Sequence, residues 1–189
     1  MKIIVTGGIG YIGSHIVIDL VDCGHEVIII DSLSKSAVKI IDRICEIVKY
    51  PDQIRFHNIS LICYKTLHAF FYETQHVDMC IHLACSHTFQ QRSDIYNNNV
   101  IGSINLLRCL ERYGYEKLLF VNYNHPNVAY CHSIDIIATI LQDIDKDKHT
   151  CLSVSMPHGS HESALLQTQS QTKESIDIQN IVDVIRTYV

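Results

Sequence analysis

The fold is decided by the segment Lys2-Ile3-Ile4-Val5-Thr6-Gly7-Gly8-Ile9-Gly10-Tyr11-Ile12-Gly13. Its first five residues include a β-branched run that predicts a short, buried parallel strand. The glycines follow at once, and apolar residues at helical spacing then continue as far as Cys23. A glycine-rich turn between a strand and a helix is typical of a dinucleotide-binding βαβ unit.

Three glycines have separate roles in this interpretation. Gly7 allows the tight turn, Gly10 lets the backbone approach a pyrophosphate, and Gly13 lets the helix pack closely on the strand. The helix N-terminus then presents unpaired N–H groups and a partial positive charge to the phosphates. The alternative is a glycine-rich turn that holds no ligand.

An acidic residue supports the ligand interpretation. Asp31 ends a second predicted strand, Glu26–Asp31, near the spacing of roughly 20 residues that is expected after the glycines. A carboxylate there accepts hydrogen bonds from a ribose and repels a 2′-phosphate, and no Arg follows it closely. This favours NAD over NADP, whereas the alternative is a turn or helix-capping residue.

The rest of the chain continues the alternation of strands and helices. Further strands are predicted at Gln53–Ile59, Val77–Ala84, Lys117–Asn122 and Thr150–Ser155, and helices at Ser36–Tyr50, Thr66–Thr74, Asp94–Tyr113 and Tyr130–Ile144. The polar stretch His158–Ser175 predicts a loop, and Ser175–Val189 a short strand or turn and then a helix. This order predicts an α/β fold, a Rossmann-type doubly wound parallel sheet with helices on both faces.

Composition limits the partners and the location. The 189 residues are 47% hydrophobic and 19% charged, which is typical of a globular domain. A net charge of −5 with scattered Lys and Arg argues against a nucleic-acid partner. The N-terminus does not resemble a signal peptide, and no apolar run approaches the ~18 residues that span a bilayer. We therefore expect a cytoplasmic protein that has no membrane partner.

The eight cysteines and twelve histidines show no metal-binding pattern. The chain contains no C-x-x-C pair and no H-x-x-x-H pair on a predicted helix. We expect reduced thiols that act mostly as small buried apolar side chains, and no metal. A metal or redox site is the alternative.

Several segments together resemble the UDP-glucose 4-epimerase family, which belongs to the extended short-chain dehydrogenase/reductase superfamily. The glycine turn is the most specific of them. Ile81-His82-Leu83-Ala84 is similar to the family's I-H-F-A strand, and Tyr96–Leu107 is similar to its Y-x-x-N-V-x-G-T-x-N-L-L helix. Pro157–Ser163 and Ile176–Val184 resemble later family segments.

The resemblance implies an NAD site. Its expected residues are Gly7, Gly10, Tyr11, Ile12 and Gly13 at the pyrophosphate, Asp31, Ser32 and Ser36 at the adenosine ribose, Asn58 and Ile59 at the adenine, and Leu83, Ala84, Cys85, His87 and Asn99 further along the cofactor. Asn58 stands where the family usually has Asp. Cys85 replaces a Gly, which would crowd the backbone, and His87 replaces a Lys.

The catalytic pattern of the family is incomplete. The family uses a Ser or Thr together with the Tyr and Lys of Y-x-x-x-K, and the Lys lowers the pKa of the Tyr. Here Phe120–Asn124 contains no serine, and the best match to Y-x-x-x-K has Tyr130 followed by Ile134 at the Lys position. His132 lies two residues after Tyr130 and does not share its helix face. Tyr130 is the predicted catalytic residue, with an ordinary helix-start aromatic as the alternative.

The C-terminal region is also reduced relative to the family. Met156 stands where the family has a substrate-binding Asn, and the sequence stops at Val189. We expect an NAD-binding Rossmann domain at 1–157 and a remnant of the substrate-binding region at 158–189, with the substrate domain largely missing.

Three functional hypotheses remain. The first is an epimerase-like NAD-binding protein with impaired or no epimerase activity. The second is an active NAD-dependent epimerase that interconverts UDP-glucose and UDP-galactose, and the third is a non-enzymatic interaction scaffold. The resemblance implies a UDP-sugar partner and a homodimer that pairs through the predicted helix Asp94–Tyr113.

Overall fold

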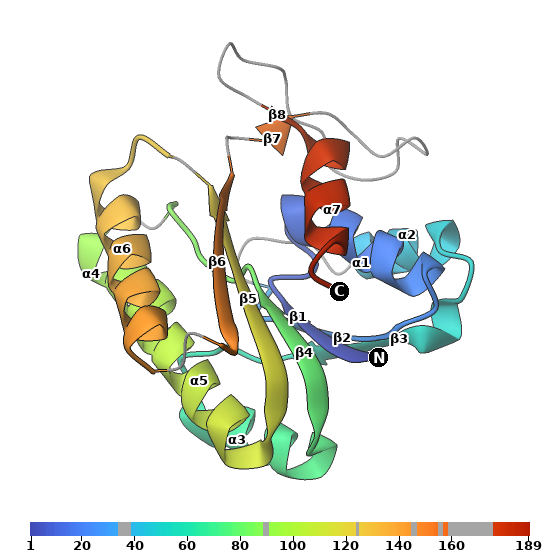
Figure 1. Cartoon of the computed structure of the whole chain (residues 1–189), viewed down its shortest axis with the longest axis horizontal. Helices are drawn as coiled ribbons and strands as arrows, with labels where there is room; N and C mark the ends of the chain where they lie inside the picture. The colour runs from blue at the N-terminus through green and yellow to red at the C-terminus, as the bar shows by residue number, and fades with distance from the viewer. Residues whose placement is uncertain (34–38, 89–90, 124, 145–146, 155–156, 159–175) are drawn as a thin grey trace.

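The structure is a computed structural model that describes residues 1–33, 39–88, 91–123, 125–144, 147–154, 157–158 and 176–189. Six parallel strands form one sheet in the order β3-β2-β1-β4-β5-β6 (Figure 1). The strands are β1 (Lys2–Thr6), β2 (Glu26–Asp31), β3 (Ile54–Asn58), β4 (Val77–His82), β5 (Tyr115–Tyr123) and β6 (His149–Val154). The predicted doubly wound Rossmann-type sheet is confirmed.

Alternate residues of the central strands enter two separate cores. In β1, Ile3 and Val5 belong to one hydrophobic cluster, whereas Ile4 belongs to the other. The same alternation along β2 places Ile29 in the first cluster and Ile28 in the second. Because successive side chains of a strand point to opposite faces, a continuous apolar run produces a sheet that is buried on both sides.

Helices cover both faces of the sheet (Figure 1). The first core contains side chains of α1 (Tyr11–Asp22), α2 (Lys39–Ile47) and α7 (Ile178–Arg186), and the second contains those of α3 (Tyr64–Thr74), α5 (Gly102–Tyr113) and α6 (Val128–Ile144). A single 3₁₀ turn, η1 (Pro51–Gln53), precedes β3.

The predicted helix Asp94–Tyr113 has an irregular beginning. It consists of α4 (Arg92–Tyr96), a π-helical turn η2 (Asn97–Ile101) and then α5. The buried residue of the π-helical turn is Asn99, which is polar, so the hydrophobic spacing does not mark the change of backbone hydrogen bonding.

The C-terminal helix packs on the first half of the sheet. β7 (Pro157–His158) pairs in parallel with β8 (Ile176–Asp177), and α7 follows at once, with Asp177 accepting a hydrogen bond from the Gln179 N–H at 2.8 Å. The apolar face of α7 packs against α1. The predicted strand and helix after residue 175 are therefore confirmed, whereas most of the predicted loop lies outside the described residues.

Cysteine burial differs from the sequence prediction. Only Cys80 and Cys109 are buried, whereas Cys23, Cys63 and Cys151 are exposed and the remaining three are intermediate. The prediction of mostly buried thiols is wrong because the number of cysteines does not indicate which face of an element each one occupies. In the described part of the chain, no helix is both long and apolar enough to cross a bilayer.

Candidate functional site

The glycine turn lies where β1 ends against the backbone that follows β4. Gly7 has φ +70°, and its N–H donates to the Ile30 carbonyl at 2.8 Å. A Cβ on Gly7 would lie 3.0 Å from backbone atoms of Ala84. Both the positive φ and the close approach require glycine, as the sequence predicted.

The two later glycines differ in what surrounds them. Gly10 caps α1 without a side chain, and a Cβ there would meet only the Gly7 carbonyl oxygen, at 3.1 Å. A Cβ on Gly13 would lie 2.2 Å from that same oxygen. Gly13 therefore permits close packing inside the protein, whereas Gly10 keeps open the space beside the helix N-terminus, where N–H groups attract phosphate.

Two adjoining cavities extend from this turn. The first, here called the β5-side pocket, has a volume of about 290 Å³ and is lined by Gly7, Gly10, Tyr11, Ile12, Gly13, Leu83, Cys85, His87, Val121, Tyr123, His125 and Tyr130. The second, the β2-side pocket, has a volume of about 270 Å³, shares part of that lining and adds Asp31, Ser32, Ile59 and Ala84 among others. Both lie at the carboxyl ends of the strands, where doubly wound sheets bind ligands.

Asp31 is held at the end of β2 by backbone donors. Its carboxylate accepts the Leu33 N–H at 2.9 Å and is also hydrogen-bonded by the N–H groups of Ile9 and Ser32. Burial raises the pKa of Asp31, and the three backbone donors oppose that shift. The carboxylate is therefore fixed and directed by the same turns that form the β2-side pocket.

Most of the predicted cofactor residues that the structure describes line these two pockets, whereas Asn58 and Asn99 do not. Asn58 is exposed at the end of β3, opposite Asp31, and is not part of the lining of either pocket. Ser36 lies outside the described residues. Cys85 occupies the lining of both pockets, where burial raises the pKa of its thiol to about 12.

Asn99 is fully buried behind the pockets. Its side chain accepts the Ser86 N–H at 2.8 Å and donates to the Ser86 carbonyl at 3.1 Å and to Ser133 Oγ at 2.8 Å. Asn99 thus ties the segment after β4 to α6. Its predicted contact with a cofactor stays a prediction.

Tyr130 reaches the β5-side pocket from the first turn of α6. Its ring is only 2% exposed. Burial raises the pKa of its phenol far above the usual value, and the neighbouring Cys85 and Tyr123 raise it further. Ile134, one turn along the same helix, is 7% exposed and belongs to the hydrophobic core. No cation therefore stands at the position from which the family's Lys lowers the pKa of the phenol.

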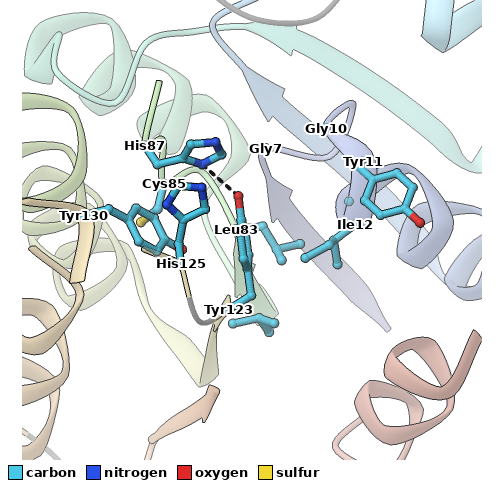
Figure 2. Close-up of a pocket in the computed structure, with 12 residues that line it drawn as sticks. Gly7, Gly10, Tyr11, Ile12, Leu83, Cys85, His87, Tyr123, His125 and Tyr130 are labelled. Carbon is cyan, nitrogen blue, oxygen red and sulfur yellow. Dashed lines mark hydrogen bonds between the residues drawn. The ribbon is translucent and has the colours of Figure 1, made fainter. Parts of the chain in front are cut away.

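The sequence prediction missed two aromatic residues of the pocket, Tyr123 and His125. Figure 2 shows their rings gathered with those of His87 and Tyr130 on the side opposite the glycine turn. The Tyr123 hydroxyl lies 2.9 Å from His87 Nδ1, and the His87 and His125 rings stack with centroids 3.9 Å apart. One sequence signal could have identified Tyr123 as a site residue. It lies in Phe120–Asn124, the segment that corresponds to the serine-containing segment of the family.

One asparagine holds this aromatic group in place. Asn127 Nδ2 donates to the His87 carbonyl at 3.1 Å, and the Asn127 N–H donates to His125 Nδ1 at 3.1 Å. Asn127 Oδ1 accepts the Tyr130 N–H at 3.1 Å. His132 is exposed on α6 and does not line the β5-side pocket. Among the described residues, no cluster of three or more His, Cys, Asp or Glu could hold a metal ion.

Residues 3–122 match the model of the NAD dependent epimerase/dehydratase family. This chain belongs to that family. The UDP-glucose 4-epimerase of Dictyostelium discoideum is 31% identical over 190 residues, covering 87% of this chain and 54% of that protein. The Pasteurella multocida UDP-glucose 4-epimerase is 30% identical, covering 88% of this chain and 56% of that protein. The chain spans about half the length of the curated relatives it matches.

Solved structures of this family share the fold. The UDP-glucose-4-epimerase of Stenotrophomonas maltophila, with bound NAD and formylated UDP-arabinopyranose, matches with a TM-score of 0.75 and 24% identity over 100% of this chain and 63% of that chain. The UDP-Glc/GlcNAc 4-epimerase of Campylobacter jejuni matches with a TM-score of 0.77 and 19% identity over 97% and 72%.

The family match includes the glycine-turn side of the two pockets but only part of the lining near β5. It includes the glycine turn, Asp31 and the segment after β4, and it ends at Asn122. Tyr123, His125 and Tyr130 follow that end. Three side chains of the β5-side pocket therefore lie beyond the matched region.

Proposed function

We propose that this chain binds NAD across the β2-side and β5-side pockets and that its epimerase activity is strongly reduced or lost. The observation that carries the first part is the turn around Gly10, which leaves open space beside the N-terminus of α1. Gly7, Gly10 and Gly13 would hold the pyrophosphate, and Asp31 and Ser32 would hold the adenosine ribose. Bound NAD supplies a hydride acceptor at the reacting carbon of a sugar.

The proposed loss of epimerase activity follows from the surroundings of Tyr130. A phenol accepts a substrate proton efficiently when a nearby cation lowers its pKa. Here Ile134 occupies the Lys position within an apolar core, and the pKa of Tyr130 is raised instead. Loss of a catalytic acid or base commonly costs a factor of about 10² to 10⁴ in rate.

The remaining parts of the proposal concern partners, domains and location. UDP-sugars are the proposed ligand class, since the Stenotrophomonas maltophila relative was solved with a UDP-sugar. Residues 1–157 would form the NAD-binding domain and 158–189 the remnant of a substrate-binding region. We also propose a homodimer through α5 and a cytoplasmic location, which the eight free cysteines favour.

Calorimetric titration with NAD tests the cofactor proposal. We expect binding by the wild type and none by Gly10→Val, because the branched side chain fills the space beside the helix N-terminus. Gly114→Ala is the control, since Gly114 has open space around it and lies outside both pockets, so its φ of +80° adds backbone strain without touching the site. Absence of heat at millimolar NAD would refute NAD binding. Conversion of UDP-galactose to UDP-glucose at an enzyme-like rate that Tyr130→Phe abolishes would refute the loss of activity.

A further inference from the structure

The β5-side pocket contains acid–base groups of an unusual kind. Its described lining includes the phenols of Tyr11, Tyr123 and Tyr130 and two imidazoles, but no Lys, Arg, Asp or Glu. No permanently charged side chain of this lining therefore assists the ionisation of these phenols. Any proton transfer in this pocket has to proceed between neutral groups.

One hydrogen bond connects a phenol to an imidazole within the pocket. Tyr123 Oη lies 2.9 Å from His87 Nδ1, and the two rings are nearly perpendicular, at 84° (Figure 2). Tyr123 comes from the end of β5 and His87 from the segment after β4. This places the imidazole edge-on to the phenol, so its nitrogen points at the hydroxyl.

Tyr123 is a poor base by itself. Burial raises its pKa to about 12, and the neighbouring Cys85 raises it in the same direction. A free phenolate is therefore rare at neutral pH. A phenol that donates its own proton while it accepts another never becomes a phenolate, and a neutral imidazole is a suitable acceptor for that proton.

We propose that Tyr123 and His87 form a proton relay for the oxidation of an alcohol to a ketone. This oxidation is the first half of the epimerase reaction. The inference rests on the proposed binding of NAD. The alcohol C–H bond breaks and its electron pair leaves as hydride to NAD. The alcohol O–H bond gives its proton to Tyr123 Oη, and Tyr123 gives its proton to His87 Nδ1. The products are a ketone, reduced NAD and a protonated His87.

The relay requires a neutral His87 before the reaction. The titratable groups packed against its ring are Tyr123, His125, Tyr130 and Cys85, which lines the same pocket. His125 Nδ1 accepts the Asn127 N–H, so a neutral His125 carries its proton on Nε2. Two stacked imidazoles at 3.9 Å resist a double positive charge, so the pair takes one proton, and the hydrogen bond from Tyr123 delivers it to His87.

The tautomer of His87 tests the relay without any turnover. In the relay, Nδ1 accepts from Tyr123, so neutral His87 carries its proton on Nε2. Nitrogen-15 NMR of the full chain distinguishes the two ring nitrogens. We expect the Nε2–H tautomer in the wild type and a mixture in Tyr123→Phe. A proton on Nδ1 in the wild type would overturn the inference, because His87 would then already donate to Tyr123.

A single-turnover measurement tests the chemistry itself. NAD-loaded protein is mixed with millimolar UDP-galactose, and reduced NAD is followed by its absorbance. We expect slow reduction by the wild type and a rate about 100-fold lower in both Tyr123→Phe and His87→Gln. The rate should also fall as the pH is lowered through the range in which imidazoles gain a proton.

The chain offers a matched control for these variants. Tyr113 Oη and His68 Nε2 form a second tyrosine–histidine hydrogen bond of 2.7 Å between α5 and α3, outside both pockets. Tyr113→Phe and His68→Gln should leave the rate unchanged. A loss in Tyr130→Phe that exceeds the loss in Tyr123→Phe would overturn the inference, as would no reduction in protein shown by calorimetry to hold NAD. Failure to bind NAD would instead refute the proposed function, and the tautomer experiment would still decide whether the pair can relay a proton.

Discussion

The glycine-turn side and the β5 side of the candidate site are built from different parts of the chain. The first side consists of backbone, glycines and one carboxylate held by backbone N–H groups. The second consists of side chains, with Tyr123, His87 and Tyr130 at its centre. The first side lies within the family match, whereas Tyr123 and Tyr130 of the second side lie beyond its end.

The difference has a steric origin. Any side chain at Gly7 or Gly13 would collide with backbone atoms, so a change there disturbs the sheet as well as the pocket. Val121 and Tyr123 at the end of β5 line a cavity, so a different side chain there alters the pocket and leaves the backbone of the turn unaffected. The chemistry of a Rossmann fold can therefore change while its phosphate turn and its sheet stay the same.

Substitution of Gly13 should have the largest effect. In Gly13→Ala, the new Cβ would lie 2.2 Å from the Gly7 oxygen and 2.8 Å from Gly8 Cα, so the backbone of the turn has to move. We expect the free energy of unfolding, measured with urea, to fall by about 3 kcal/mol, at the upper end of the usual cost of overpacking.

Gly24→Ala is the control for this prediction. Gly24 has φ +85° and open space around it, so only backbone strain opposes the substitution, at about 1–2 kcal/mol. Equal losses in the two variants would show that the close packing at Gly13 does not limit the turn, and the steric contrast between the two sides would fail.

A buried histidine joins the two sides and should make stability depend on pH. Thr6 Oγ1 lies 2.6 Å from His82 Nδ1, and His82 Nε2 lies 2.7 Å from Ser103 Oγ. Ser103 donates to the Asn99 carbonyl at 2.5 Å, so it accepts from His82 Nε2–H, and Nδ1 of a neutral His82 accepts from the Thr6 hydroxyl. Burial lowers the pKa of His82 to about 4.

The sign of this effect follows from proton binding in the two states. Below about pH 6.5 the unfolded chain protonates His82, whereas the folded chain does so only near pH 4. The stabilisation is complete above pH 6.5 and is lost as the pH falls toward 4, by about 3 kcal/mol. Urea unfolding at pH 7 and pH 4.5 should show this loss, and His82→Gln should show a smaller one. An equal acid loss in the variant would assign it to other groups.

Much of the fold was predictable because buried strands have a local signal, a short run of β-branched residues. The bounds of β1 and β2 match the prediction to the residue, since β-branched runs followed by glycine or an acid are local signals. The π-helical turn at Asn97–Ile101 was not predictable, because its buried residue, Asn99, is polar and leaves no mark in the hydrophobic spacing. The burial of the cysteines required the tertiary structure.

The candidate site was predictable on one side only. Glycine spacing and the acid after the second strand pointed to Gly7, Gly10 and Asp31, and all three line a pocket. The Tyr123–His87 pair joins residues 36 positions apart, and their meeting depends on how the chain leaves β5. Such a contact between different elements has no counterpart in the local spacing of residues.

The smallest expected effect concerns the docking of α7 on the glycine-turn side. Arg186 forms two hydrogen bonds with the Asp19 carboxylate of α1, one of them from Nε to Oδ2 at 3.0 Å. The Arg186 side chain is 52% exposed, so water and salt screen the pair. We expect Arg186→Ala to lower the free energy of unfolding by less than about 1 kcal/mol, and by less still in high salt.

The apolar face of α7 provides the comparison for that small effect. Ile181 is 1% exposed in the core shared with α1, and Ile181→Ala should cost about 2–5 kcal/mol. A double-mutant cycle of Arg186→Ala with Asp19→Ala in urea unfolding isolates the ion pair. A coupling above about 2 kcal/mol would show that charge holds α7 in place. A coupling below 1 kcal/mol would show that α7 is held by the same apolar packing that supports the glycine turn.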